Sequence, residues 1–438
     1  MAYLPEQPFS FVDLFCGPGG LSVGFTWAGF VPLLAVDKVK DCTDTYAANH
    51  PSTIVMTEDF RELSEDKIKR LLRQRCGATS VDVVVGGPPC ESFSTAGPAI
   101  RKAGDVRDTL FEHIIRIAKA LRARYLLIEN IPGLVSKASR AGVKGGVFTG
   151  LLHRLIEHGF TRYDYRVLDA ADYGVPQFRR RLFVLATSDK CLPVVFPEPS
   201  HAAPSEAARR GLWQWVTVDD AIGDLPSLCS RQRDSERASG YTKEPENDFQ
   251  RLMHGQSTSE FPVPPAYLVP HGLIPSELTY HWAPNHRPAT IERLRMIRQG
   301  EGLRDLWMRL DPKEREDLQR SRVLPARWYI QRFRRLVPGE PSVTVTSHCL
   351  DELAHPSDDR LVTVREAARL QSFADSYQFP GGKWINPHGF EPQDKYEQIG
   401  DAVPPLLAWN LARCLRAGLQ VLDPEQTHPR RRNSAKRA

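Results

Sequence analysis

The sequence lacks the features that mark a secreted, membrane-spanning or zinc-binding protein. Its eight cysteines are never closer together than 14 residues, so there is no CxxC pair for zinc and no dense disulfide framework. No run of 18 apolar residues occurs, and the N-terminal MAYLPEQPFS has no basic segment followed by an apolar stretch. We therefore expect reduced thiols, no metal site, no membrane association and a cytoplasmic location.

The chain also lacks a large excess of charge of either sign. Its 438 residues include 58 Lys+Arg and 53 Asp+Glu, a net charge of +5, which permits a nucleic-acid partner without requiring one. Hydrophobic residues make up 41% and charged residues 25%, values close to the globular average that exclude a wholly disordered or collagen-like chain. The length favours one large domain with an insert, or two domains.

Short apolar runs alternate with amphipathic stretches from residue 9 to about 187, which predicts βα units around a mostly parallel sheet, an α/β fold. The predicted strands are 11–16, 31–36, 81–85, 125–128, 165–168 and 182–186. The clearest predicted helices are 62–75, 110–122, 364–373 and 403–419. The first domain is therefore expected to occupy residues 1–187 and to resume later in the chain.

The alternation stops between residues 188 and 341, where prolines are frequent. This stretch predicts a separate, smaller and irregular domain, and its basic part, 287–335, is a candidate for contact with phosphates. Residues 342–423 are expected to return to the first domain, and 424–438 to form a disordered basic tail.

A glycine-rich turn follows the first predicted strand and opens a helix. In Cys16-Gly17-Pro18-Gly19-Gly20-Leu21-Ser22, glycines would let the backbone approach a nucleotide-like cofactor, and Asp37, 20 residues after Gly17, could accept ribose hydroxyls. No Gly-Lys-Ser/Thr follows the turn, and the third glycine of a dinucleotide fingerprint is missing. S-adenosylmethionine fits this pattern better, although such a turn alone could simply connect a strand to a helix.

Three further segments place reactive side chains at the same predicted sheet edge. Cys90 follows a buried strand in GGPPCESFS and suits a nucleophile, although a lone cysteine is more often a buried structural thiol. Glu129 and Asn130 end the fourth predicted strand, and burial would raise the pKa of such a carboxyl so that it could act as an acid. The run from Arg179 to Arg181 adds positive charge, or forms a solvated basic face.

Taken together, these segments resemble the cytosine-5 DNA methyltransferase family of bacterial type. FVDLFCGPGG is similar to the family's cofactor loop, GGPPCESFS to its nucleophile loop, ENIPG to its acid motif and QFRRRLFV to its arginine motif. RLVTVREAARLQSFAD (360–375) and GDAVPPLLA (400–408) resemble its last two motifs, in the family's unpermuted order. The resemblance implies a Rossmann-like S-adenosylmethionine-dependent methyltransferase fold, with the target recognition domain in 188–341.

The resemblance also implies the catalytic roles. Cys90 would add to carbon 6 of a cytosine, Glu129 would hold or protonate ring nitrogen 3, and Asn130 would brace the cysteine loop. Arg181, and less directly Arg179, would bind the carbonyl oxygen of the base. Because carbon 5 is a poor nucleophile, the reaction needs the covalent thiolate adduct, and the target base must leave the duplex.

The implied cofactor residues belong to six parts of the chain. They are Phe15, Gly17, Gly19, Gly20, Leu21, Asp37, Asp59, Phe60, Pro89, Leu110, Asp401 and Ala402. Two positions depart from the family pattern: Asp401 is commonly Asn, and Glu91 replaces the more usual Gln after the nucleophile. Both substitute an acceptor-only carboxylate for an amide, so the contacts made there are expected to differ.

The sequence thus predicts a DNA (cytosine-5-)-methyltransferase that acts on duplex DNA with S-adenosylmethionine as cofactor. It would work as a monomer, either beside a cognate restriction endonuclease or as an orphan bacterial enzyme. Two alternatives stay open, a tRNA cytosine-5 methyltransferase and a catalytically inactive DNA-binding relative. The 154 residues of 188–341 favour duplex reading over the first, and the presence of Cys90 and Glu129 argues against the second.

Overall fold

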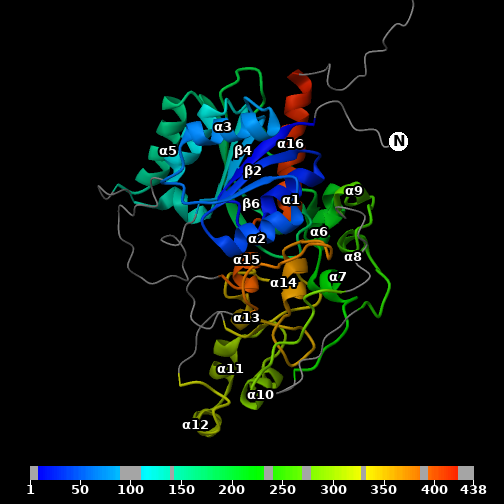
Figure 1. Cartoon of the computed structure of the whole chain (residues 1–438). Coiled ribbons are helices and arrows are strands. Elements are labelled where there is room, and N and C mark those ends of the chain that lie inside the picture. The colour runs from blue at the N-terminus through cyan, green and yellow to red at the C-terminus, as the bar shows by residue number, and fades with distance from the viewer. Residues whose placement is uncertain are drawn as a thin grey trace, which may run out of the picture.

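The computed structural model of the chain describes residues 8–88, 110–138, 143–230, 240–268, 278–326, 332–384 and 393–422. Cys90, Pro89 and Glu91 lie outside the described residues, as does the basic tail. Figure 1 shows a sheet-containing domain and, beneath it, a second lobe of short helices.

A seven-stranded, mostly parallel sheet forms the centre of the larger domain. Its strands are β1 (Ser10–Leu14), β2 (Val31–Asp37), β3 (Ile54–Thr57), β4 (Val83–Gly86), β5 (Tyr125–Asn130), β6 (Arg162–Asp169) and β7 (Arg180–Thr187). They lie in the order β3-β2-β1-β4-β5-β7-β6, and only β7 runs antiparallel to its neighbours. The α/β prediction is confirmed, but the prediction of six strands was wrong because it missed β3, a four-residue edge strand that is only half-buried.

Helices cover both faces of this sheet. They are α1 (Gly20–Trp27), α2 (Lys40–Asn49), α3 (Glu65–Cys76), α4 (Leu110–Ala120), α5 (Gly146–Glu157) and α16 (Pro405–Leu422), with short 3-10 turns at η2 (Pro132–Ser136) and η3 (Ala170–Tyr173). Successive residues of a strand point to opposite faces, so Val83 and Val85 pack with α1 and α16 while Val84 packs with α3, α4 and α5. Helix α16 therefore packs the C-terminal part of the described chain against the sheet domain.

The second lobe consists of short helices and two-residue strands. The helices are α6 (Pro204–Arg210), α7 (Val218–Ile222), α8 (Asp248–Met253), α9 (Pro265–Leu268), α10 (Pro288–Met296), α11 (Leu303–Arg309), α12 (Pro312–Arg320), α13 (Cys349–Glu352), α14 (Val364–Leu370) and α15 (Lys395–Asp401). The strands are β8 (His201–Ala202), β9 (Trp213–Gln214), β10 (Arg334–Arg335) and β11 (Leu353–Ala354). Helices α10, α11 and α12 lie farthest from the sheet (Figure 1).

Buried charges around α14 hold the second lobe together. Arg360 pairs with Glu366 at 2.7 Å, and Arg369 pairs with both Asp375 and Asp224, the last of which comes from the proline-rich stretch. All five side chains are at most 1% exposed, so these pairs are shielded from water. None of the helices in the described ranges is long and apolar enough to cross a membrane.

Candidate active site

The glycine-rich turn after β1 contains several residues with positive φ, a conformation that glycine adopts readily. Phe15, Gly17 and Gly19 all have positive φ, at 61°, 51° and 102°. A Cβ atom on Gly20 would lie 2.1 Å from the carbonyl oxygen of Val403, and one on Gly19 would lie 2.8 Å from the hydroxyl of Tyr377. A Cβ on Gly17 would meet nothing within 4 Å. Gly19 and Gly20 thus allow close packing against Tyr377 and Val403. Gly17 instead faces open space after β1, and we call this space, which a ligand can fill, the cradle at Gly17.

Asp37 closes one side of this cradle. It is the last residue of β2, and its two carboxylate oxygens accept from the backbone N–H groups of Gly17 and Val39, each at 2.9 Å. Burial raises the pKa of Asp37, and these two N–H groups oppose that rise. Each oxygen keeps a second lone pair, so the carboxylate can still accept from the ribose hydroxyls of a cofactor.

Phe15, Asp59 and Phe60 gather at the same edge of the sheet. The rings of Phe15 and Phe60 stack with centroids 3.8 Å apart and an interplanar angle of 22°. Hydrogen bonds from Arg61 lower the pKa of Asp59 to about 2, so its carboxylate is ionised at neutral pH. Leu21 in α1 and Leu110 at the start of α4 are buried. These positions suit an adenine and ribose, so the residues present fit S-adenosylmethionine.

Glu129 and Arg181 meet at the ends of β5 and β7. The Nε of Arg181 lies 3.1 Å from Oε1 of Glu129, and the two side chains are only 16% and 14% exposed. Burial raises the pKa of Glu129, although the charges of Arg181 and Arg179 act in the opposite direction. Gly87 begins the loop beside them, and a Cβ there would lie 3.0 Å from Oε2 of Glu129. The carboxyl is thus suited to hold and give up a proton next to the loop that leads to Cys90.

Asn130 contacts the described part of that loop. Its Nδ2 donates to the carbonyl of Pro88 at 3.2 Å, while its own side-chain oxygen accepts from the N–H of Ile131 at 3.0 Å. Asn130 thus contacts the loop that it was predicted to brace, at Pro88. Cys90 itself lies outside the described residues.

Arg179 lies away from the Glu129–Arg181 pair. Its guanidinium, 2% exposed, donates to the carbonyls of Val345 at 2.7 Å, Gly400 at 2.8 Å and Ala402 at 3.1 Å. With three donors bound to backbone, this arginine holds the turn at Ala402, which packs against Gly20. Asp401, next to Ala402, is exposed and accepts from Nε2 of Gln393 at 3.2 Å.

Sequence reasoning missed several polar residues beneath the glycine turn. The hydroxyl of Tyr46 donates to Ser22 at 2.7 Å, and Ser22 donates to Asp13 at 2.6 Å. Burial raises the pKa of Asp13 to about 7. The nine-residue spacing of Asp13 and Ser22 is visible in the sequence, but nothing there brings Tyr46 to them. No group of three or more His, Cys, Asp or Glu side chains placed to hold a metal occurs in the part of the chain that the structure describes.

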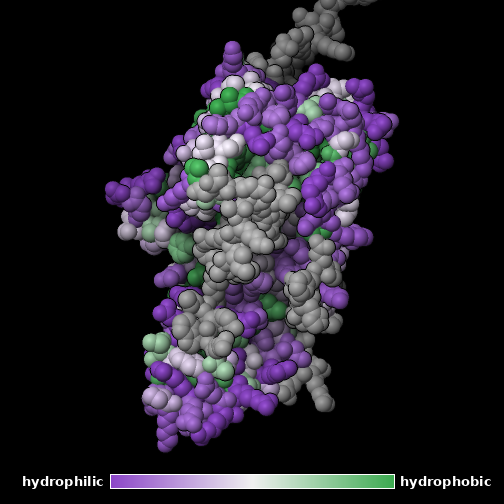
Figure 2. Space-filling view, turned by 90° about the vertical axis from the view of Figure 1, so that its left-hand side faces the viewer, coloured by the Kyte–Doolittle hydropathy of each residue, from purple (hydrophilic) through white to green (hydrophobic). Residues whose placement is uncertain are grey.

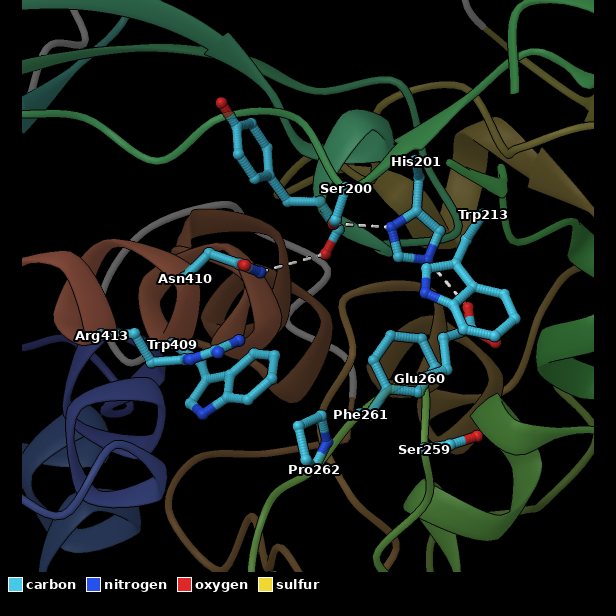
Figure 3. A pocket seen from close by; sticks show the side chains of 11 residues that line it. Ser200, His201, Trp213, Ser259, Glu260, Phe261, Pro262, Trp409, Asn410 and Arg413 are labelled. Atoms are coloured by element: carbon cyan, nitrogen blue, oxygen red, sulfur yellow. Dashed lines mark hydrogen bonds and ion pairs between the residues drawn. The ribbon is translucent and has the colours of Figure 1, made fainter. Parts of the chain in front are cut away.

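A separate cavity of about 250 Å³ is lined in part by α16. His201 hydrogen-bonds Ser200 and Glu260 on one side of it, each at 2.8 Å, and Trp409 and Arg413 of α16 lie on the other side (Figure 3). None of the residues predicted to bind cofactor or to act in catalysis lines it. The candidate active site is therefore the C-terminal edge of the sheet and not this cavity.

Comparisons with known proteins agree with this geometry. The model of the C-5 cytosine-specific DNA methylase family matches residues 9–416. The chain belongs to this family. It is 33% identical to the type II methyltransferase M.AgeI of Thalassovita gelatinovora, over 93% of this chain and 99% of the relative. It is 31% identical to M.DdeI of Desulfomicrobium norvegicum, over 92% and 87%. A solved DNA modification methyltransferase encoded within an E. coli prophage superposes with a TM-score of 0.68 at 25% identity, covering 94% of this chain and 99% of that one.

Membership explains the arrangement of the site. This DNA methylase uses S-adenosylmethionine as its methyl donor. Open space at Gly17 and the carboxylate of Asp37 lie together at the sheet edge, in an arrangement that such a cofactor fits. The predictions of an enzyme, of its fold and of its cofactor are confirmed.

Proposed function

We propose that this methylase modifies carbon 5 of a cytosine within a specific sequence of duplex DNA, as a bacterial type II modification enzyme that works beside a restriction endonuclease or alone. The observation that carries the proposal is the Glu129–Arg181 pair at the sheet edge, next to the loop that leads to Cys90. The type II names of relatives such as M.AgeI support the restriction context. A monomeric state stays a prediction.

We expect Cys90 to be the nucleophile. Its thiolate would form a bond to carbon 6 while Glu129 gives a proton to ring nitrogen 3, which moves the ring's electron pair toward carbon 5. S-adenosylmethionine supplies the electrophilic methyl group. Loss of the carbon 5 proton to a base then breaks the bond to Cys90, and return of the nitrogen 3 proton to Glu129 restores the neutral aromatic ring. The raised pKa of Glu129 supports its role as the acid.

Arg181 would stabilise the charge that develops on the base. Its Nε faces Glu129 and its Nη1 donates to the carbonyl of Arg180 at 2.9 Å, so we expect Nη2 to meet the carbonyl oxygen of the cytosine. The buried contacts of Arg179 support a structural role for that residue.

The cytosine must leave the duplex to reach this edge, at a cost of a few kcal/mol that protein–DNA contacts offset. We assign those contacts to residues 188–341 as the target recognition domain. Helices α10–α12 and the segments beside them carry exposed basic side chains, namely Arg295, Arg298, Arg304, Lys313, Arg320 and Arg322. Hydrophilic side chains predominate at this end of the molecule (Figure 2).

Not all of the basic stretch can serve this purpose. Phe333 is 7% exposed and packs in the core of the second lobe, and Arg335 is 6% exposed. Arg335 donates to the carbonyls of Ile297 at 2.8 Å and His355 at 2.9 Å. These two residues hold the lobe together, so within 287–335 we assign phosphate contact to the exposed basic side chains and not to Arg335.

Base-resolution mapping of 5-methylcytosine tests the proposal. DNA would be taken from a methylation-free bacterial host that expresses the chain or its Cys90→Ala variant. We expect methylation at one short motif with the parent chain and none with the variant. A folded, cofactor-binding protein that leaves DNA unmarked would contradict the DNA substrate, and tRNA from the same cells would be examined next.

A further inference from the structure

Tyr377 reaches the cofactor turn from a distant part of the chain. It lies between α14 and α15, is 7% exposed, and its hydroxyl donates to the carbonyl oxygen of Pro18. A Cβ atom on Gly19 would lie 2.8 Å from this hydroxyl and 3.0 Å from the ring of Tyr46. The two tyrosines thus fill the space beneath the turn.

The Pro18–Gly19 peptide is fixed at both ends by these contacts. Its N–H, on Gly19, donates to the carbonyl of Cys16 at 3.0 Å, and its carbonyl, on Pro18, accepts from Tyr377. The hydrogen bond from Gly19 to Cys16 closes the turn around Gly17 and Pro18, so this peptide and Gly17 belong to one tight turn. Without the hydroxyl, a buried carbonyl would lose its partner, and a rotated peptide would regain one only by disturbing the turn.

Tyr377 itself is held firmly. Its carbonyl accepts from Nη2 of Arg365 at 3.1 Å, and the same guanidinium donates through Nε to the carbonyl of Thr279 at 3.1 Å. The next residue, Gln378, exchanges two hydrogen bonds with the side chain of Asn49 at the end of α2, at 2.7 and 2.9 Å. These contacts therefore hold the hydroxyl of Tyr377 in one position beside the turn.

We propose that Tyr377 is a positioning residue for cofactor binding: its hydroxyl orients the Pro18–Gly19 peptide and keeps the cradle at Gly17 formed before S-adenosylmethionine arrives. The tyrosine touches no reacting atom. It should therefore affect the affinity for the cofactor and leave the chemical step and the affinity for DNA largely unchanged.

The matched control is Tyr125. Its ring is 1% exposed and its hydroxyl donates to the carbonyl of another proline, Pro193, at 2.6 Å. It begins β5, so it lies at the opposite edge of the sheet from the candidate active site. Tyr125→Phe removes the same kind of hydrogen bond without touching the turn.

The test is calorimetric binding of S-adenosylhomocysteine to the full chain without DNA, comparing the parent with Tyr377→Phe and Tyr125→Phe. We expect about tenfold weaker binding for Tyr377→Phe and less than twofold for Tyr125→Phe, with similar small losses of thermal stability in both. Steady-state kinetics should show a raised KM for S-adenosylmethionine with kcat and the KM for DNA within twofold.

Equal binding by the parent and Tyr377→Phe would overturn the proposal, as would equal weakening in both variants. Because the binding measurement needs no nucleic acid, it stands even if the substrate proposed above is wrong.

Discussion

Two glutamates of this methylase lie beside an arginine, and their pKa values shift in opposite directions. At the sheet edge, Glu129 makes one contact with Arg181, at 3.1 Å, and burial raises its pKa. In the second lobe, burial also disfavours the charge of Glu366, but Arg360 donates to it twice, at 2.7 and 2.8 Å, and the N–H of Thr363 donates at 2.7 Å. The pKa of Glu366 is therefore lowered well below its ordinary range.

The difference shows that an arginine neighbour does not by itself keep a buried carboxyl ionised. What decides the direction is whether nearby positive charges and hydrogen-bond donors together outweigh the loss of water. At Glu366 the charges of Arg360 and His355 and the hydrogen bonds from Arg360 outweigh it, whereas at Glu129 the charges of Arg181 and Arg179 do not. Glu129 has too few described donors to offset its burial, so it can carry a proton, as an acid must. Glu366 has enough to stay ionised and to hold the start of α14. The same pair of residue types thus serves chemistry in one place and architecture in the other.

The largest expected effect is on activity, at the sheet edge. Glu129→Gln keeps the shape of the side chain but cannot give up a proton, so we expect methyl transfer to fall by roughly 10²–10⁴-fold. Binding of S-adenosylhomocysteine should stay within twofold, because the cradle at Gly17 does not involve Glu129. Single-turnover transfer of a labelled methyl group measures the first quantity and calorimetry the second. A variant that retained more than a tenth of the parent rate would contradict the role of Glu129 as the acid.

The next effect is on stability, in the second lobe. Glu366→Gln leaves the buried guanidinium of Arg360 with less compensating charge, and we expect a loss of about 3–5 kcal/mol in the free energy of unfolding. The control is Glu292→Gln, which breaks a pair with Arg295 whose side chains are 52% and 59% exposed. Exposed pairs contribute about 0–1 kcal/mol. Urea unfolding of both variants compares them, and equal losses would refute the distinction.

Elements whose signal lies in a few consecutive residues could be predicted from the sequence. Val83 to Val85 are buried on both faces of the sheet, so their apolar run identified β4, and the glycines that allow the turn after β1 identified the cofactor loop. The edge strand β3 was missed because Ile54–Thr57 is short and half-buried, which weakens the apolar signal.

Contacts between distant parts of the chain could not be predicted. Arg179 shares an arginine-rich run with Arg181, yet its partners are carbonyls 166 to 223 residues away, and a carbonyl leaves no mark in a sequence. Tyr377 is separated from Pro18 by 359 residues. The roles of Arg179 and Tyr377 depend on the C-terminal part of the chain packing against the sheet domain. Only the folded structure shows which residues that packing brings together.

The last expected effect, a dependence of stability on pH, extends the comparison to Asp13, a buried carboxyl with a single hydroxyl donor, Ser22, and one oxygen without a partner among the described residues. Burial raises its pKa from 3.8 to about 7, so between these values the folded state keeps a proton that the unfolded state has lost. Stability should therefore fall as pH rises from about 4 to 7, by at most about 1.4 kcal/mol per pH unit, and then level off.

Asp13→Asn should remove this slope, because the amide oxygen still accepts from Ser22 but the side chain no longer titrates. Asp59→Asn is the control: hydrogen bonds from Arg61 lower the pKa of Asp59 to about 2, so its contribution is constant above about pH 5 and is lost only in more acidic solution. Urea midpoints at pH 5 and pH 7 compare the parent with both variants. If the parent were equally stable at both values, or if Asp59→Asn flattened the slope as Asp13→Asn does, then the buried carboxyl of Asp13 would not be the source of the pH dependence.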